Sequence, residues 1–187
     1  VGARPGEAKV LFTNSGTGAI EAALKLARFH TGRHLALAFY GSFHGRTMGA
    51  LSLTASKAVQ RRGFGPMLPA AVHVPYADCY RCPFGRTPDA CVTECVGFIE
   101  NYPLKSTTPS EEVAALIVEP VQGKGGYVVP PARFFQRLRD LCDRHGMIGI
   151  ELVKDRATRE ALIPWQDPRF GVMGGGGVMG RMREAAM

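Results

Sequence analysis

The chain has 187 residues, 45% of them hydrophobic, which is enough for one ordinary domain with a core of its own. Its 23 lysine and arginine residues exceed its 16 acidic residues and give a formal net charge of +7, but they are scattered and often stand among acids, which favours solvated helix faces over nucleic-acid binding. No apolar run approaches membrane-spanning length and the N-terminal residues lack the apolar core of a signal peptide, so we expect a cytoplasmic protein that binds no membrane.

The stretch from Leu11 to Arg28 begins with a short apolar run, passes through a turn of small residues and continues as an amphipathic helix. Asn14 or Ser15 fits the N-cap position and Gly32 fits the stop. Such a turn presents backbone N–H groups at the positive end of the helix dipole, a geometry that binds phosphate. An ordinary capped helix fits the same residues, so this stretch alone does not decide between the two readings.

Strands and helices alternate along the rest of the chain. Strands are predicted over 34–40, 71–74, 113–118 and 147–153, and helices over 92–102 and from Pro131 to about Gly146. This order indicates a mostly parallel sheet covered on both faces. Residues 14–17, 41–46 and 119–123 each follow a strand, so we expect them to converge at the carboxyl edge of the sheet. Residues 171–180, rich in glycine and methionine, lack any apolar period and predict a loose tail.

Three short motifs occupy these strand ends: TNSGT at 13–17, FHGRT at 43–47 and EPVQG at 119–123. In this order and spacing they resemble the class III (ornithine/4-aminobutyrate type) aminotransferases, which use pyridoxal phosphate. The resemblance implies an α/β fold, namely part of the large domain of the fold type I pyridoxal-phosphate-dependent transferases, a three-layer sandwich around a mostly parallel sheet. It implies amino-group transfer from an amino acid to a 2-oxo acid, and a homodimer of the family type.

Residue by residue, the resemblance implies a phosphate site at the start of the first helix. Ser15, Gly16 and Thr17 would hold the cofactor phosphate through backbone N–H groups and the Thr17 hydroxyl. Position 18 is Gly where the family usually has Glu, which removes an acid from the first turn.

The other two motifs imply contacts with the cofactor ring and the substrate. Phe43 would stack on the pyridine ring with His44 beside it, and Glu119 resembles the family's glutamate near that ring. Arg46 would offer a bidentate guanidinium to a substrate carboxylate. Position 124 is Lys where the family usually has an acid, which puts the usual pairing with a pocket arginine in doubt. Without the resemblance, a core phenylalanine, a surface ion pair and a loop carboxylate would explain these residues.

The largest departure follows His145-Gly146. The family continues there with a strand that carries an aspartate for the pyridinium nitrogen, and later with the Schiff-base lysine. This chain passes directly to 148–160, which resembles a strand of the family's small C-terminal domain. Aligned from Gly146, side-chain alternation puts Leu152 in the aspartate's place and Glu151 on the opposite face.

We therefore interpret the chain as a truncated, internally deleted member of the family. Residues 1–146 would be the N-terminal part of the cofactor-binding large domain, 147–160 a strand like that of the small domain, and 161–187 a loose tail rich in glycine and methionine. No lysine stands in the family's Schiff-base context, so we assign no catalytic residue and expect this chain alone to be inactive.

Five cysteines without a secretory signal argue against a disulfide framework. Cys79, Cys82, Cys91 and Cys95 have a spacing near that of zinc sites but not a standard one, and some prokaryotic family members have a similar segment. Reduced thiols explain the cluster, so we predict no metal. The alternative that stays open is a non-catalytic binding or interaction module, stapled by zinc through these four thiols.

Overall fold

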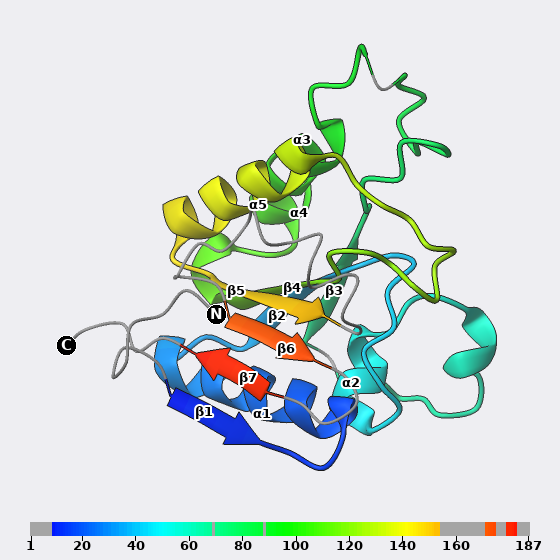
Figure 1. Ribbon diagram of the computed structural model, residues 1–187. Helices are drawn as coiled ribbons and strands as arrows, with labels where there is room; N and C mark the ends of the chain where they lie inside the picture. Colours follow the sequence, from blue (N-terminus) through cyan, green and yellow to red (C-terminus); the bar gives the residue numbers. More distant parts are fainter. Residues whose placement is uncertain (1–8, 69, 88, 154–170, 175–178, 183–187) are drawn as a thin grey trace.

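The computed structural model describes residues 9–68, 70–87, 89–153, 171–174 and 179–182, which form a parallel sheet between two layers of helices (Figure 1). The strands of this sheet are β2 (Leu35–Phe39), β3 (Ala71–Val74), β4 (Val113–Val118), β5 (Ile148–Val153) and β6 (Gly171–Gly174). They lie in the order β3-β2-β4-β5-β6, and every neighbouring pair is parallel. The predicted α/β fold with a mostly parallel sheet is confirmed.

Helices cover both faces of the sheet (Figure 1). α1 (Gly16–Thr31) and α2 (Met48–Leu53) pack on one face, and α3 (Glu94–Asn101), α4 (Pro103–Ser106) and α5 (Ala132–His145) pack on the other. Two 3-10 turns, η1 (Ala58–Gln60) and η2 (Ser110–Glu112), lie in the connections. α1 ends at Gly32 in the left-handed conformation (φ 67°), as predicted for its stop. None of the helices among the described residues is long and apolar enough to cross a bilayer.

The two faces of the sheet carry cores of different character. Among the described residues, the core on the face toward α1 holds aliphatic side chains only, many of them small: Ala19, Ala23 and Ala27 of the helix and Ala36, Ala38 and Ala115 of the strands lie among isoleucines and leucines. The opposite face is aromatic, because Phe39, Tyr76 and Phe134 meet edge to face with ring centroids 5.2–5.7 Å apart. Small side chains let the backbone of α1 lie close to the sheet.

The glycine- and methionine-rich segment does not behave as predicted. Instead of a loose tail, residues 171–174 form β6, which pairs in parallel with β5, and β7 (Met179–Met182) pairs antiparallel with β1 (Lys9–Phe12). Strand pairing uses backbone N–H and C=O groups, so it needs no apolar period in the side chains. The prediction of a loose tail is corrected for these residues, and the rest of 161–187 lies outside the described residues.

The residues after Gly146 enter the sheet, as the side-chain pattern predicts. β5 pairs in parallel with β4, with Glu151 opposite Val118. Ile150 and Leu152 belong to the core on the α1 side, so Glu151 points to the other face, where it is only 5% exposed. The expected alternation along this strand is therefore confirmed, and residues 154–160 of the predicted segment lie outside the described part of the chain.

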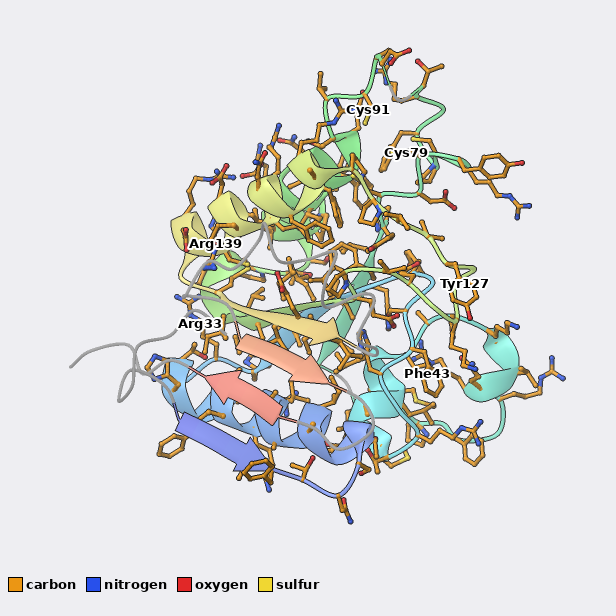
Figure 2. All side chains as sticks on the ribbon, viewed as in Figure 1. Arg33, Phe43, Cys79, Cys91, Tyr127 and Arg139 are labelled. Carbon is orange, nitrogen blue, oxygen red and sulfur yellow. The ribbon has the colours of Figure 1, made fainter. Side chains whose placement is uncertain are left out.

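Arg33 joins three elements at the amino edge of the sheet. Its Nη1 donates to the carbonyl oxygens of His145 (2.8 Å) and Gly146 (3.1 Å) at the end of α5, and to that of Val113 (3.2 Å) at the start of β4. The oxygens at the end of α5 carry the negative end of the helix dipole, so a guanidinium there is favourable. Figure 2 shows Arg33 between β5 and the α1 layer.

We expect Arg33→Ala to lower the free energy of unfolding by about 2 kcal/mol, because partly buried carbonyl oxygens at the end of α5 and the start of β4 lose a charged donor. Arg33→Lys keeps the charge but not the planar guanidinium. Its free energy of unfolding should lie between those of Arg33→Ala and the unsubstituted chain. Urea denaturation followed by circular dichroism measures the change. Arg62→Ala, at an exposed position, is the control and should stay within about 0.5 kcal/mol of the unsubstituted chain. An Arg33→Ala value as small as the control's would contradict the role assigned to Arg33.

Candidate functional site

The start of α1 is arranged to accept an anion. Ser15 caps the helix, because its Oγ accepts from the backbone N of Gly18 (3.2 Å) and its carbonyl oxygen accepts from the N of Ala19 (3.0 Å). The first N–H groups of a helix have no partner within it, so those of Gly16 and Thr17 remain for a ligand. The first turn holds no acid, and the helix dipole adds positive potential. We call Ser15, Gly16 and Thr17 the phosphate cup.

The loop after β2 lies directly against this phosphate cup. The hydroxyl oxygens of Thr17 and Thr47 are 2.8 Å apart. Gly45, with φ 144°, makes this approach possible, because a Cβ at that position would clash with the Thr17 side chain. The first two motifs, distant in the sequence, therefore meet at one end of α1.

The predicted ring and substrate residues lie along this loop. Phe43 is half-buried, and Figure 2 places it at the edge of the sheet toward which the arrows of β5 and β6 point. His44 is buried, and its backbone N donates to the Thr54 hydroxyl (3.0 Å). Arg46 is exposed, so its guanidinium is accessible to a ligand in solution.

Glu119 connects the third motif to the second. It follows β4 directly and is fully buried. Its Oε1 accepts from the backbone N of Phe43 (2.5 Å), and its Oε2 accepts from that of Gly123 (3.4 Å). Gln122 adds a second tie, since its Nε2 donates to the carbonyl oxygen of Tyr40 (2.8 Å). All three motifs therefore lie together at the carboxyl edge, as predicted. The reason given for the first motif is corrected, because β1, the strand before it, pairs with β7 in a separate two-stranded sheet.

Tyr76 supports the backbone below Glu119. Its hydroxyl donates to the carbonyl oxygen of Glu119 (2.7 Å) and lies 3.3 Å from that of Pro120. Burial, and secondarily the negative charge of Glu119, raise the pKa of Tyr76 well above 10. The phenol is therefore a permanent donor under ordinary conditions.

Sequence reasoning missed three residues that organise this edge: Glu21, Thr47 and Gln122. Thr47 and Gln122 stand inside the quoted motifs but were given no role. Glu21 lies four residues after Thr17, which places both side chains on the same face of α1. That spacing is the signal that could have identified Glu21.

The four clustered cysteines line one small apolar pocket, together with Tyr76 and Pro131. Burial raises the pKa of Cys95 to about 12 and raises that of Cys79, where the neighbouring thiols of Cys91 and Cys82 add to the effect. All are free thiols. Within the described ranges, no group of three or more His, Cys, Asp or Glu side chains is placed to hold a metal ion.

Comparison with known proteins gives a consistent set of relatives. The profile of the family described as Aminotransferase class-III matches residues 2–153. The chain is 38% identical over 144 residues to the alanine/serine racemase of Pyrococcus horikoshii. This alignment covers 75% of this chain and 30% of that protein. It is 44% identical over 142 residues to the acetylornithine aminotransferase of Methanopyrus kandleri. This second alignment covers 76% of this chain and 30% of that protein.

Solved structures agree with this assignment. The fold superposes on an amine transaminase from an uncultivated Pseudomonas species, solved in its PLP-bound form, with a TM-score of 0.71 and 35% identity. The match covers 78% of this chain and 34% of that one. The chain therefore spans about a third of the length of these relatives.

The raised pKa of Tyr76 predicts a loss of stability in alkali. Below pH 10 the phenol is protonated in both states, so its contribution is complete; above pH 10 the unfolded state alone releases the proton, and stability falls as the pH rises toward the folded-state pKa. Denaturant midpoints measured from pH 9 to 11.5 should therefore fall less steeply for Tyr76→Phe than for the unsubstituted chain. Tyr80→Phe, at a side chain 90% exposed, should leave the slope unchanged. Parallel slopes for all three proteins would contradict the prediction.

The buried thiols should react slowly. Burial raises the pKa of both Cys142 and Cys95 to about 12, so little of either is thiolate at pH 7.5. Timed alkylation with iodoacetamide and peptide mass mapping should label Cys82 and Cys91, which are half-buried, first. Alkylation of the unfolded chain in guanidinium is the control and should remove the difference. Labelling of Cys142 at the rate of Cys82 in the folded chain would show that the core opens.

Proposed function

From the premise that this chain belongs to the class III aminotransferase family, we propose that it binds pyridoxal 5'-phosphate and is part of an enzyme that transfers an amino group from an amino acid to a 2-oxo acid. The observation that carries the proposal is the meeting of three family motifs at one sheet edge, through Thr17–Thr47 and Glu119–Phe43. Residues 1–146 would then be the N-terminal part of the cofactor-binding domain. A family-type homodimer in the cytoplasm remains a prediction.

The residues at this edge fit the cofactor. A phosphate dianion needs several hydrogen-bond donors, which the N–H groups of Gly16 and Thr17 at the start of α1 provide. The first turn of α1 contains no acidic residue that would repel it. Bound pyridoxal phosphate supplies an electron sink for the substrate. Phe43 offers a flat apolar face to the ring, and Glu119 fixes the backbone that carries this side chain. Arg46 is exposed, and its guanidinium could bind a substrate carboxylate through two parallel hydrogen bonds.

We propose that this chain holds the cofactor without a covalent bond and is inactive alone. No lysine stands in the family's Schiff-base context. Leu152 takes the place of the family's aspartate and packs in the core on the α1 side, while Glu151 points to the opposite face. The ring nitrogen therefore lacks an acidic partner from this strand.

A second candidate reaction is amino acid racemisation. It is favoured by the alanine/serine racemase of P. horikoshii, a relative 38% identical to this chain. The two reactions differ in the fate of the amino group, because only transfer consumes a 2-oxo acid. Conversion of a 2-oxo acid into an amino acid and loss of optical rotation are thus separate readouts. Purified chain should give neither, and activity in either assay would refute the proposed inactivity.

Binding can be measured by the change in absorbance when pyridoxal phosphate is titrated into the purified chain. Phe43→Ala should weaken binding by at least about fivefold, because a stacked aromatic contributes roughly 1 kcal/mol beyond its buried area. Phe29→Ala, at a side chain 89% exposed near the other end of α1, is the matched control and should bind as the unsubstituted chain does. Borohydride reduction followed by peptide mapping should give no stoichiometric pyridoxyl-lysine.

Each alternative has its own signature in this experiment. A stoichiometric adduct on one lysine would overturn the non-covalent proposal, and Lys124 would be examined first. Equal affinities for Phe43→Ala and the unsubstituted chain would remove Phe43 from the site. A chain that binds no cofactor but carries one zinc ion through Cys79, Cys82, Cys91 and Cys95 would instead be the zinc-stapled binding module.

A further inference from the structure

Glu21 caps a helix that is not its own. Its Oε1 accepts from the Thr47 hydroxyl (2.5 Å) and from the backbone N of Ala50 (3.0 Å). Thr47 is the N-cap residue of α2, yet its side chain makes no capping bond to that helix. The carboxylate from α1 therefore satisfies the N–H group that an N-cap side chain ordinarily takes, at the end of α2 where a negative charge is favourable.

The hydroxyl protons of this cluster have a defined direction. Thr47 has one hydroxyl proton, and a carboxylate can only accept, so that proton goes to Glu21. In the 2.8 Å contact between the two threonines, Thr17 must then be the donor. Its hydroxyl proton is therefore not available to a phosphate in this arrangement, contrary to the role predicted from the sequence, and the backbone N–H groups of Gly16 and Thr17 are the donors left for it. The chain of hydrogen bonds thus runs from the phosphate cup, through the loop after β2, back to α1.

Two glycines make room for this arrangement. A Cβ at Gly45 would clash with the Thr17 side chain, and a Cβ at Gly49 would clash with the Glu21 carboxylate. Glycine thus stands at two positions where the backbone of the loop and of α2 meets a side chain of α1. A residue with a side chain at Gly45 or Gly49 would displace Thr17 or Glu21, so the hydrogen bonds between α1 and the start of α2 depend on these two glycines.

We propose that Glu21 and Thr47 form a latch that fixes the 41–47 loop beside the phosphate cup, so that phosphate and ring contacts are held at a set separation. This inference rests on the proposed cofactor site and adds positioning residues to it. The cup belongs to α1, where Ser15 caps the helix without help from the loop. Phe43 and Arg46 belong to the loop. A ligand that touches both parts needs the latch, whereas one that touches only the cup does not.

Two ligands separate positioning from a general loss of structure. Thr47→Val removes the hydroxyl, and Thr47→Ser keeps it as the matched control. Isothermal titration should show pyridoxal phosphate binding about tenfold weaker to Thr47→Val and within threefold of the unsubstituted chain for Thr47→Ser. Inorganic phosphate, which reaches only the cup, should bind all three within twofold. Equal weakening of both ligands, or of neither, would overturn the latch.

Amide hydrogen exchange tests the latch without any ligand. Glu21→Ala should speed amide exchange at Ala50 and across 43–47, and Thr47→Val should speed it across 43–47. Glu21→Gln keeps a hydrogen-bond acceptor, so it should speed exchange less than Glu21→Ala does. If the unsubstituted chain binds no pyridoxal phosphate, the proposed function fails, and exchange still decides the latch. Unchanged exchange in both Glu21→Ala and Thr47→Val would overturn it. If Glu21→Ala does not fold, the comparison of Thr47→Val with Thr47→Ser decides.

Discussion

The buried carboxylate of Glu119 constrains the whole carboxyl edge of the sheet. A charge taken out of water costs several kcal/mol unless hydrogen-bond donors surround it, and here the donors include the backbone of the loop after β2. Moving that loop away would leave the carboxylate without one of them. The position of Phe43 is thus determined by the requirements of a residue 76 positions away in the sequence. The 2.5 Å bond to its amide is shorter than the 2.8 Å bond between Gln122 and the carbonyl oxygen of Tyr40.

The difference between the two cores explains how α1 can take part in the site. Alanines on both the helix and the strands let α1 lie close to the sheet, and its first turn contacts the segment that follows β2. Larger side chains at these alanine positions would push α1 away from the sheet and separate Thr17 from Thr47. The aromatic side chains lie on the opposite face, where α5 covers the sheet.

Much of this structure follows from local patterns. The buried run of β4, the apolar face of α5 and the small-residue turn before α1 each fix an element from a few neighbouring residues, and the parallel order of the sheet follows from their alternation. The motifs then indicate which edge carries the site. The hydrogen bonds there could not be predicted in this way. Glu21 looks like any exposed acid on a helix until α2 is placed beside it, and the glycine-rich β6 has no side-chain pattern to identify it.

The pairing of β1 with β7 has a consequence for the order in which the chain acquires its structure. It joins the first described strand to the last, whereas the neighbouring strands β2 and β3 are close in the sequence. Contacts between distant segments carry the largest loop-closure cost and form late. During synthesis, α1 would leave the ribosome long before β7 has been made. β7 is the strand that pairs with β1, which directly precedes α1. The β1–β7 pair therefore cannot form until synthesis has passed Met182, well after α1 is complete.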